Sequence, residues 1–121
     1  EIALLDACRE LEVALVAFSP LGRGFLTGAV KDPERLEEGD MRCNMPRFSA
    51  ENYPHNQKLF KQLAALAQAL SVTPGQLALA WLKAKGDDII PIPGTRSPDH
   101  MRENLAAETL RLDIDTEEFS F

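Results

Sequence analysis

The chain has 121 residues, of which 45% are hydrophobic, and a formal charge of −6 at neutral pH. This length and composition suit one small globular unit, and the acidic excess argues against nucleic acid or an anionic membrane as a partner. The sequence has no run of about 18 apolar residues that could span a bilayer, and no secretion signal at its start. Cys8 and Cys43 form neither a metal-ligand spacing nor a disulfide framework, so we expect a cytoplasmic setting and no bound metal.

The first half of the chain predicts a helix, a strand and a long loop. An amphipathic pattern over residues 2–11 predicts the helix, with Cys8 as a small buried hydrophobe on its apolar face. The uninterrupted apolar run 13–18 is typical of a strand that is buried on both faces in a parallel sheet. Residues 23–56 are rich in glycine, proline and charged side chains, which predicts a functional or mobile loop.

The second half predicts three helices and another strand. Apolar spacing predicts a helix over residues 57–70. Thr73 is placed to cap the next helix and to form a capping box with Gln76. Residues 88–92 predict a second buried strand, and residues 98–107 a helix that follows it.

These elements give the order α-β-loop-α-α-β-α. Two buried strands separated by helices imply parallel pairing through crossover connections. Because such strands need neighbours on both sides, and because the chain begins inside an amphipathic pattern without a methionine, we expect it to be part of a larger α/β fold. Trp81 is expected in the core, and the acidic tail is expected to form a partial helix from Asp115.

The junction after the second strand predicts an anion site. Ser97 is a suitable N-cap, Pro98 fits the first helical position, and Asp99 suits the first turn. A helix start of this kind leaves several backbone N–H groups open to an anion, and Arg96 and His100 add positive charge. We interpret the junction as a phosphate seat, with a purely structural turn as the alternative.

Two motifs carry a family resemblance. The segments Phe18–Gly28, FSPLGRGFLTG, and Ile92–Asn104, IPGTRSPDHMREN, together resemble the aldo-keto reductases, in the branch that includes the potassium-channel β-subunits. The resemblance covers essentially the whole chain and implies the C-terminal portion of a (β/α)₈ TIM barrel, with its last two strands and no separate second domain. In such barrels the site lies at the carboxyl ends of the strands, where both motifs are found.

The resemblance also implies a binding site for NADP(H). Phe18 would stack on the nicotinamide, Arg96 would bind the 2′-phosphate by its guanidinium, and His100 would assist it with a charge that depends on pH. Glu103 and Asn104 would hydrogen-bond the adenine. The complete set of cofactor-binding residues implied is Phe18, Ser19, Pro20, Leu21, Gly22, Arg23, Gly94, Thr95, Arg96, His100, Glu103 and Asn104.

The catalytic Asp, Tyr, Lys and His of the family match no residue of this chain, so no catalytic residue is assigned. Tyr53 and His55 fall in the predicted loop and are expected to be exposed or to anchor it. The acidic stretch 34–40 is expected to be a solvated face rather than a metal site.

Two departures concern the phosphate-binding residues. Ala29 stands where the family often has a pyrophosphate-clamping lysine, and Lys31 is out of register. Arg42 or Arg47 is the candidate for a second clamping arginine, with a solvated loop charge as the alternative.

The first functional hypothesis is the cofactor-binding part of an enzyme that reduces aldehydes or ketones by hydride transfer. These 121 residues would be inactive alone. The alternative is a noncatalytic, truncated protein that acts as a nucleotide-binding or assembly module. A third reading is a different phosphate-binding β/α barrel. Because open strand edges favour pairing, we expect the isolated chain to form homo-oligomers.

Overall fold

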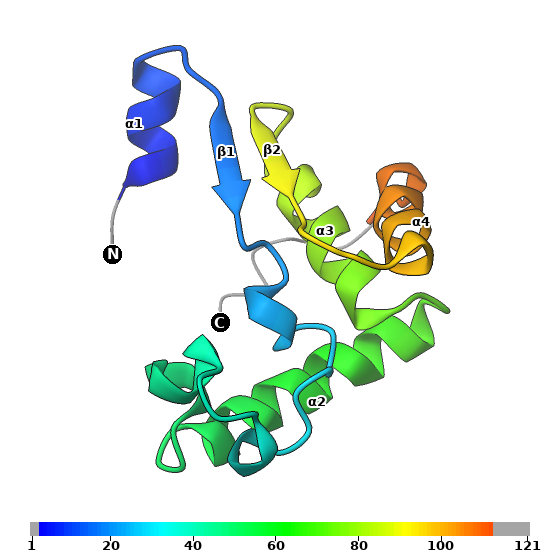
Figure 1. Ribbon diagram of the computed structural model, residues 1–121. Coiled ribbons are helices and arrows are strands. Elements are labelled where there is room, and N and C mark those ends of the chain that lie inside the picture. Colours follow the sequence, from blue (N-terminus) through cyan, green and yellow to red (C-terminus); the bar gives the residue numbers. More distant parts are fainter. Residues whose placement is uncertain (1–2, 113–121) are drawn as a thin grey trace. The chain divides into compact units, whose positions relative to one another are not determined.

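The computed structural model describes residues 3–112, so the partial helix expected from Asp115 lies outside the described part (Figure 1). These residues form two compact units. The strand unit contains residues 3–20 and 76–112, and the loop unit contains residues 21–75.

The strand unit is built on two parallel strands. Its elements are α1 (Leu4–Glu10), β1 (Leu15–Phe18), most of α3 (Pro74–Ala84), β2 (Ile89–Ile92) and α4 (Pro98–Ala106). Leu15 pairs with Ile89, and the register continues until Phe18 pairs with Ile92. The two arrows in Figure 1 therefore point the same way, and both strands end at the same edge of the sheet.

The strands are less buried than their apolar sequence predicts. Ile89 is buried, but Val16, Ile90 and Ile92 are about half exposed, and Phe18 is 74% exposed. The described sheet has two strands, so no third strand or further helix layer covers the remaining apolar groups. The expectation of strands buried on both faces is therefore wrong for this chain taken by itself.

Helix α1 is attached to the strand unit mainly by polar contacts. Arg9 Nε donates to Asp88 Oδ2 at 2.7 Å, and Arg9 Nη2 donates to the carbonyl oxygen of Lys85 at 2.7 Å. No residue of α1 is buried, and Cys8 is half-buried instead of lying in a core as expected. An ion pair at the start of β2 thus fixes this helix.

Helix α3 supplies the buried apolar segment of the strand unit, with Leu77, Leu79 and Ala80 each 3% exposed. Trp81 is half-buried, less than a core position predicts, and the Nζ atom of Lys85 lies 4.8 Å from its ring centroid. The Nε2 atom of Gln76 donates to the carbonyl oxygen of Glu103 at 3.1 Å. Lys83 pairs with Glu108, so polar contacts join α3 to α4 and to the turn after it.

The loop unit is folded rather than irregular. It contains short 3₁₀ turns at Gly22–Gly24, Pro33–Arg35, Met41–Asn44 and Pro46–Phe48, followed by helix α2 (Tyr53–Ala69). Helix α2 begins four residues earlier than the apolar spacing predicts, with Pro54 in its first turn, where proline is well tolerated. Tyr53 and His55 therefore lie on a helix and not in the loop.

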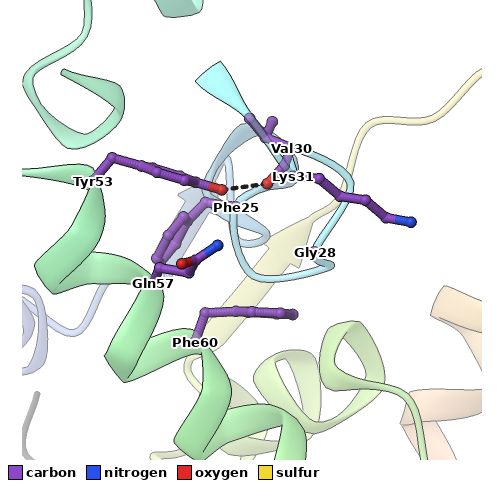
Figure 2. Close-up of a pocket in the computed structure, with 7 residues that line it drawn as sticks. All are labelled: Phe25, Gly28, Val30, Lys31, Tyr53, Gln57 and Phe60. Atoms are coloured by element: carbon purple, nitrogen blue, oxygen red, sulfur yellow. Dashed lines mark hydrogen bonds between the residues drawn. The ribbon is translucent and has the colours of Figure 1, made fainter. Parts of the chain in front are cut away.

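Aromatic side chains hold the loop against α2. Phe25 meets Phe48 and Phe60 edge to face, with ring centroids 6.3 and 6.2 Å apart. The hydroxyl of Tyr53 donates to the carbonyl oxygen of Val30 at 2.5 Å. Figure 2 shows Tyr53, Gln57 and Phe60 projecting from α2 toward the loop, around a cavity of about 350 Å³. The predicted loop thus has its own small core.

Within residues 3–112, no single helix is both long and apolar enough to cross a bilayer. The pair α2 and α3 reaches that length and composition only when the two are joined across a sharp bend.

Candidate nucleotide-binding site

The register of the strands brings the starts of both sequence motifs to one edge of the strand unit. Phe18 and Ile92 are paired, so Ser19 and Gly94 follow from the same carboxyl edge. Ser19 has a φ of 51°, an uncommon conformation for a residue other than glycine, which turns the chain directly after β1. The largely exposed ring of Phe18 is thus presented where strand-end sites lie in β/α barrels.

The start of α4 is capped as the sequence predicts. Ser97 Oγ accepts from the backbone N–H of His100 at 3.3 Å, and Pro98 follows in the first turn. Thr95 Oγ1 accepts from the N–H of Ser97 at 3.1 Å, and the Ser97 carbonyl accepts from the N–H of Met101 at 3.0 Å. Three backbone donors are therefore satisfied within the segment. The expectation of several open N–H groups needs this correction, and an anion here would depend more on side chains.

Those side chains make an open, cationic surface. Arg96 and His100 are exposed, and no atom lies within 4 Å of the position that a Cβ on Gly94 would take. Glu103 and Asn104 are half-buried further along α4.

The loop unit, taken by itself, contains a tight turn with unusual backbone geometry. Gly22, Arg23 and Gly24 have φ values of 60°, 58° and 89°, so three successive residues lie in the left-handed region. Leu21 before them has a φ of −97° and a ψ of 12°. Right-to-left-handed changes of the backbone are found in anion-binding concavities. In this turn the N–H of Gly24 donates to the carbonyl oxygen of Leu21 at 3.2 Å and that of Phe25 to the carbonyl oxygen of Gly22 at 3.2 Å, so these two donors are satisfied within the turn.

Two arginines from later in the loop lie against this turn. A Cβ atom on Gly22 would be 2.9 Å from Nη1 of Arg47, and one on Gly24 would be 3.6 Å from Nη1 of Arg42. Arg23 itself donates to the sulfur of Met41 at 3.0 Å. Both candidates for a second clamping arginine therefore reach the glycine-rich turn, a geometry that suits phosphate oxygens.

Asp40 organises one of these arginines, a role that the sequence analysis missed. Its Oδ1 accepts from Arg42 Nε at 2.9 Å, and its Oδ2 accepts from Arg42 Nη2 at 2.5 Å. Hydrogen bonds from the Arg42 side chain and backbone lower the pKa of Asp40 to about 2. The pair is ionised at neutral pH, and the spacing Asp-x-Arg was the available sequence signal.

Tyr53 and His55 take the roles expected of them, although on a helix. The hydrogen bond from the Tyr53 hydroxyl to Val30 anchors the loop, and His55 is exposed. Burial raises the pKa of Tyr53, so its hydroxyl stays protonated near neutral pH and does not act as a base. Among residues 3–112, no group of His, Cys, Asp and Glu is arranged to hold a metal ion.

Two parallel strands that end at one edge are compatible with part of a β/α barrel, and comparison with solved structures gives the fold. The solved structure of the glycerol dehydrogenase AKR11B4 from Gluconobacter oxydans matches the fold with a TM-score of 0.77 at 22% identity, over 92% of this chain and 33% of its own. The thermostable aldo-keto reductase Tm1743 matches with a TM-score of 0.62 at 28% identity, over 96% of this chain and 31% of its own.

Sequence comparison gives the family. The family model for the aldo/keto reductase family matches residues 1–119, and the chain belongs to that family. It is 48% identical over 112 residues to aldo-keto reductase yakc of Schizosaccharomyces pombe, whose name specifies NADP(+), and 45% identical to aldo-keto reductase str7 of Strobilurus tenacellus. Each alignment covers 93% of this chain and 33% of the relative, so the chain spans about a third of their length.

Proposed function

We propose that this chain supplies the last two strands and the NADP(H)-binding part of an aldo-keto reductase barrel that reduces aldehydes or ketones. The observation that carries the proposal is the strand register, because pairing of Phe18 with Ile92 brings the starts of both motifs to one carboxyl edge. Family membership and the NADP(+)-specific name of the fission yeast relative support it. A cytoplasmic location belongs to the same proposal.

The nicotinamide half of the cofactor is assigned to the first motif. The exposed ring of Phe18 would stack on the nicotinamide, and Ser19 and Pro20 would line the adjoining ribose. The Leu21–Gly24 turn, with Arg23 at its tip, would hold the pyrophosphate, because its glycines admit close approach of phosphate oxygens. Arg42 would supply charge-assisted hydrogen bonds there, and so would Arg47.

The adenosine half is assigned to the second motif. Gly94 and Thr95 leave space at the start of α4, where Arg96 and His100 would hold the 2′-phosphate. Glu103 and Asn104 would hydrogen-bond the adenine from the next turn. Because three backbone N–H groups are already satisfied, Arg96 would provide most of the attraction for this phosphate.

The bound dinucleotide would supply the hydride for a carbonyl carbon. This chain's part is to bind and orient it, since the hydroxyl of its single tyrosine is committed to Val30. The proton donor and the walls around the carbonyl substrate are assigned to the remaining two thirds of the barrel. A noncatalytic nucleotide-binding module would share the cofactor contacts but lack carbonyl reduction in the complete protein.

Replacement of Arg96 tests the cofactor assignment in a complete barrel that contains residues 1–121. Arg96→Ala should weaken NADPH binding about ten- to a hundredfold, because a charge-assisted hydrogen bond contributes roughly 1.5–3 kcal/mol. NADH binding should hardly change, because NADH carries no 2′-phosphate. Fluorescence titrations with both cofactors measure the two affinities.

Arg102→Ala is the matched control. Arg102 lies on the same helix but pairs with Asp99 at 2.7 Å, so its loss should leave the preference for NADPH intact. His100→Ala should weaken NADPH binding less than Arg96→Ala does. If Arg96→Ala lowers the affinities for NADPH and NADH equally, Arg96 does not recognise the 2′-phosphate.

A further inference from the structure

One carboxylate of the loop unit determines how an arginine faces the glycine-rich turn. Asp40 contacts the Nε and Nη2 atoms of Arg42, with distances of 2.5–3.1 Å. These contacts occupy one edge of the guanidinium and leave Nη1 outside the pair. Nη1 is the atom that lies 3.6 Å from the Cβ position of Gly24. The ion pair thus selects which nitrogen of Arg42 faces the turn.

The loop unit contains a second Asp–Arg pair at the start of a 3₁₀ turn, with the arginine three residues after the aspartate instead of two, and it serves as an internal comparison. Asp32 accepts from the N–H of Glu34 at 3.0 Å and pairs with Arg35, just as Asp40 accepts from the N–H of Arg42 at 2.9 Å. The side chains of Arg35 and Asp32 are 87% and 44% exposed, against 29% for Arg42 and 19% for Asp40. The Asp32–Arg35 pair shows that capping of a 3₁₀ turn does not require such shelter, so capping alone does not account for the burial of the Asp40–Arg42 pair.

We propose that Asp40 is a positioning residue for the dinucleotide, which holds Arg42 so that its Nη1 donates to the pyrophosphate at the Gly22–Gly24 turn. This inference rests on the proposed function, because the pyrophosphate is the group that brings anionic oxygens to the turn. A long arginine side chain loses rotamer freedom when it binds a phosphate, and this loss of entropy weakens binding. Because Asp40 already holds Arg42 in place before the ligand binds, most of that entropy cost does not arise on binding. Asp40 itself does not touch the ligand.

The variant Asp40→Asn distinguishes two effects of the carboxylate on cofactor binding: its placement of Arg42 and its own negative charge. Removal of a negative charge near a phosphate site would by itself strengthen anion binding. Loss of positioning should instead weaken the binding of NADPH and NADH alike, by about tenfold each, because both carry the pyrophosphate. The ratio of the two affinities should stay constant, in contrast to Arg96→Ala. Fluorescence titration of the complete barrel measures both affinities.

Two further variants isolate the path through Arg42. Asp32→Asn removes the corresponding carboxylate of the exposed pair and should leave both affinities unchanged. In an Arg42→Ala background, Asp40→Asn should cause no additional loss, because a positioning residue acts only through its partner. An equal loss with and without Arg42 would show that Asp40 merely stabilises its turn. That result, or tighter binding by Asp40→Asn, would overturn the inference.

Failure of this inference differs visibly from failure of the proposed function. A wild-type barrel that binds neither dinucleotide contradicts the proposed function. If the wild-type barrel and the Asp40→Asn barrel bind NADPH equally well, only the positioning role is contradicted. If Asp40→Asn does not fold, Asp40→Glu is the alternative variant, because it keeps the charge but shifts the carboxylate by one methylene. Asp40→Glu should lower the affinities for NADPH and NADH in the same proportion.

Discussion

Gly28 is the residue on which the packing of the loop unit depends most closely. It has a φ of 72°, and a Cβ atom there would lie 2.6 Å from Cζ of Phe60 and 3.1 Å from Cε1. The Phe60 ring is packed edge to face against Phe25 and also lines the cavity, so it would have to shift within this aromatic cluster to admit a Cβ atom. Figure 2 shows the same loop passing beside the ring, on the wall of the cavity.

Gly28→Ala should therefore destabilise the protein by two separate effects. A left-handed alanine costs about 1–2 kcal/mol, and overpacking costs about 1–3 kcal/mol more. Gly39→Ala is the control, because Gly39 has a φ of 90° but no atom within 4 Å of its Cβ position. Denaturant unfolding should show a larger loss of unfolding free energy for Gly28→Ala than for Gly39→Ala. Equal losses would mean that backbone strain alone accounts for the destabilisation and that the contact with Phe60 adds nothing.

At the scale of elements, α1 offers the sharpest test because few contacts hold it. Asp88→Asn removes the carboxylate that binds Arg9, and amide exchange along α1 should become faster, while global stability changes little, as for exposed ion pairs. Gly86→Ala should also speed exchange along α1 with both charges kept, since its Cβ would lie 2.2 Å from Asp88 Oδ1, but its φ of 154° adds a backbone cost to global stability that Asp88→Asn lacks. Unchanged amide exchange along α1 in both variants would show that the Arg9–Asp88 ion pair does not hold this helix in place.

The stabilisation of α1 by the Arg9–Asp88 ion pair should depend on pH. The hydrogen bond from Arg9 lowers the pKa of Asp88 below its ordinary value of 3.8. A carboxyl with a lowered folded pKa stabilises the structure above the ordinary value, and that stabilisation disappears as the pH falls through the folded value. Protection of α1 in wild-type protein should therefore decrease in strong acid, and in Asp88→Asn it should already be low at neutral pH.

Elements with local signals could be predicted from sequence, and elements that depend on distant contacts could not. The cap of α4 needs only Ser97 and its neighbours, so it could be predicted residue by residue. The start of α2 at Tyr53 depends on Val30, 23 residues earlier, and on stacking against Phe48, which apolar periodicity does not reveal. The contents of the site do not follow this division. The glycine-rich turn was recognised in the sequence, whereas the contact between Asp40 and Arg42 was not, although only two residues separate them and their spacing is a local signal.

At the scale of the whole molecule, the apolar strands lack most of their partners. Val16 and Ile90 are cross-strand neighbours and are 54% and 49% exposed, although their residue types suit an interior. The chain spans about a third of the relatives it matches. On the proposed function, these side chains would be covered by other strands in the complete barrel.

The isolated 121-residue chain should therefore associate, because open strand edges and apolar faces pair with other copies. Light scattering coupled to size exclusion should give a mass above the 13.4 kDa of one chain. Val16→Lys combined with Ile90→Lys places two like charges opposite each other on the exposed face, and should shift the population toward smaller species. Leu70→Lys, at a 43% exposed position on the loop unit, is the control and should leave association unchanged. A stable wild-type monomer, or a lysine pair that associates as strongly as wild type, would show that the strands are not the associating surface.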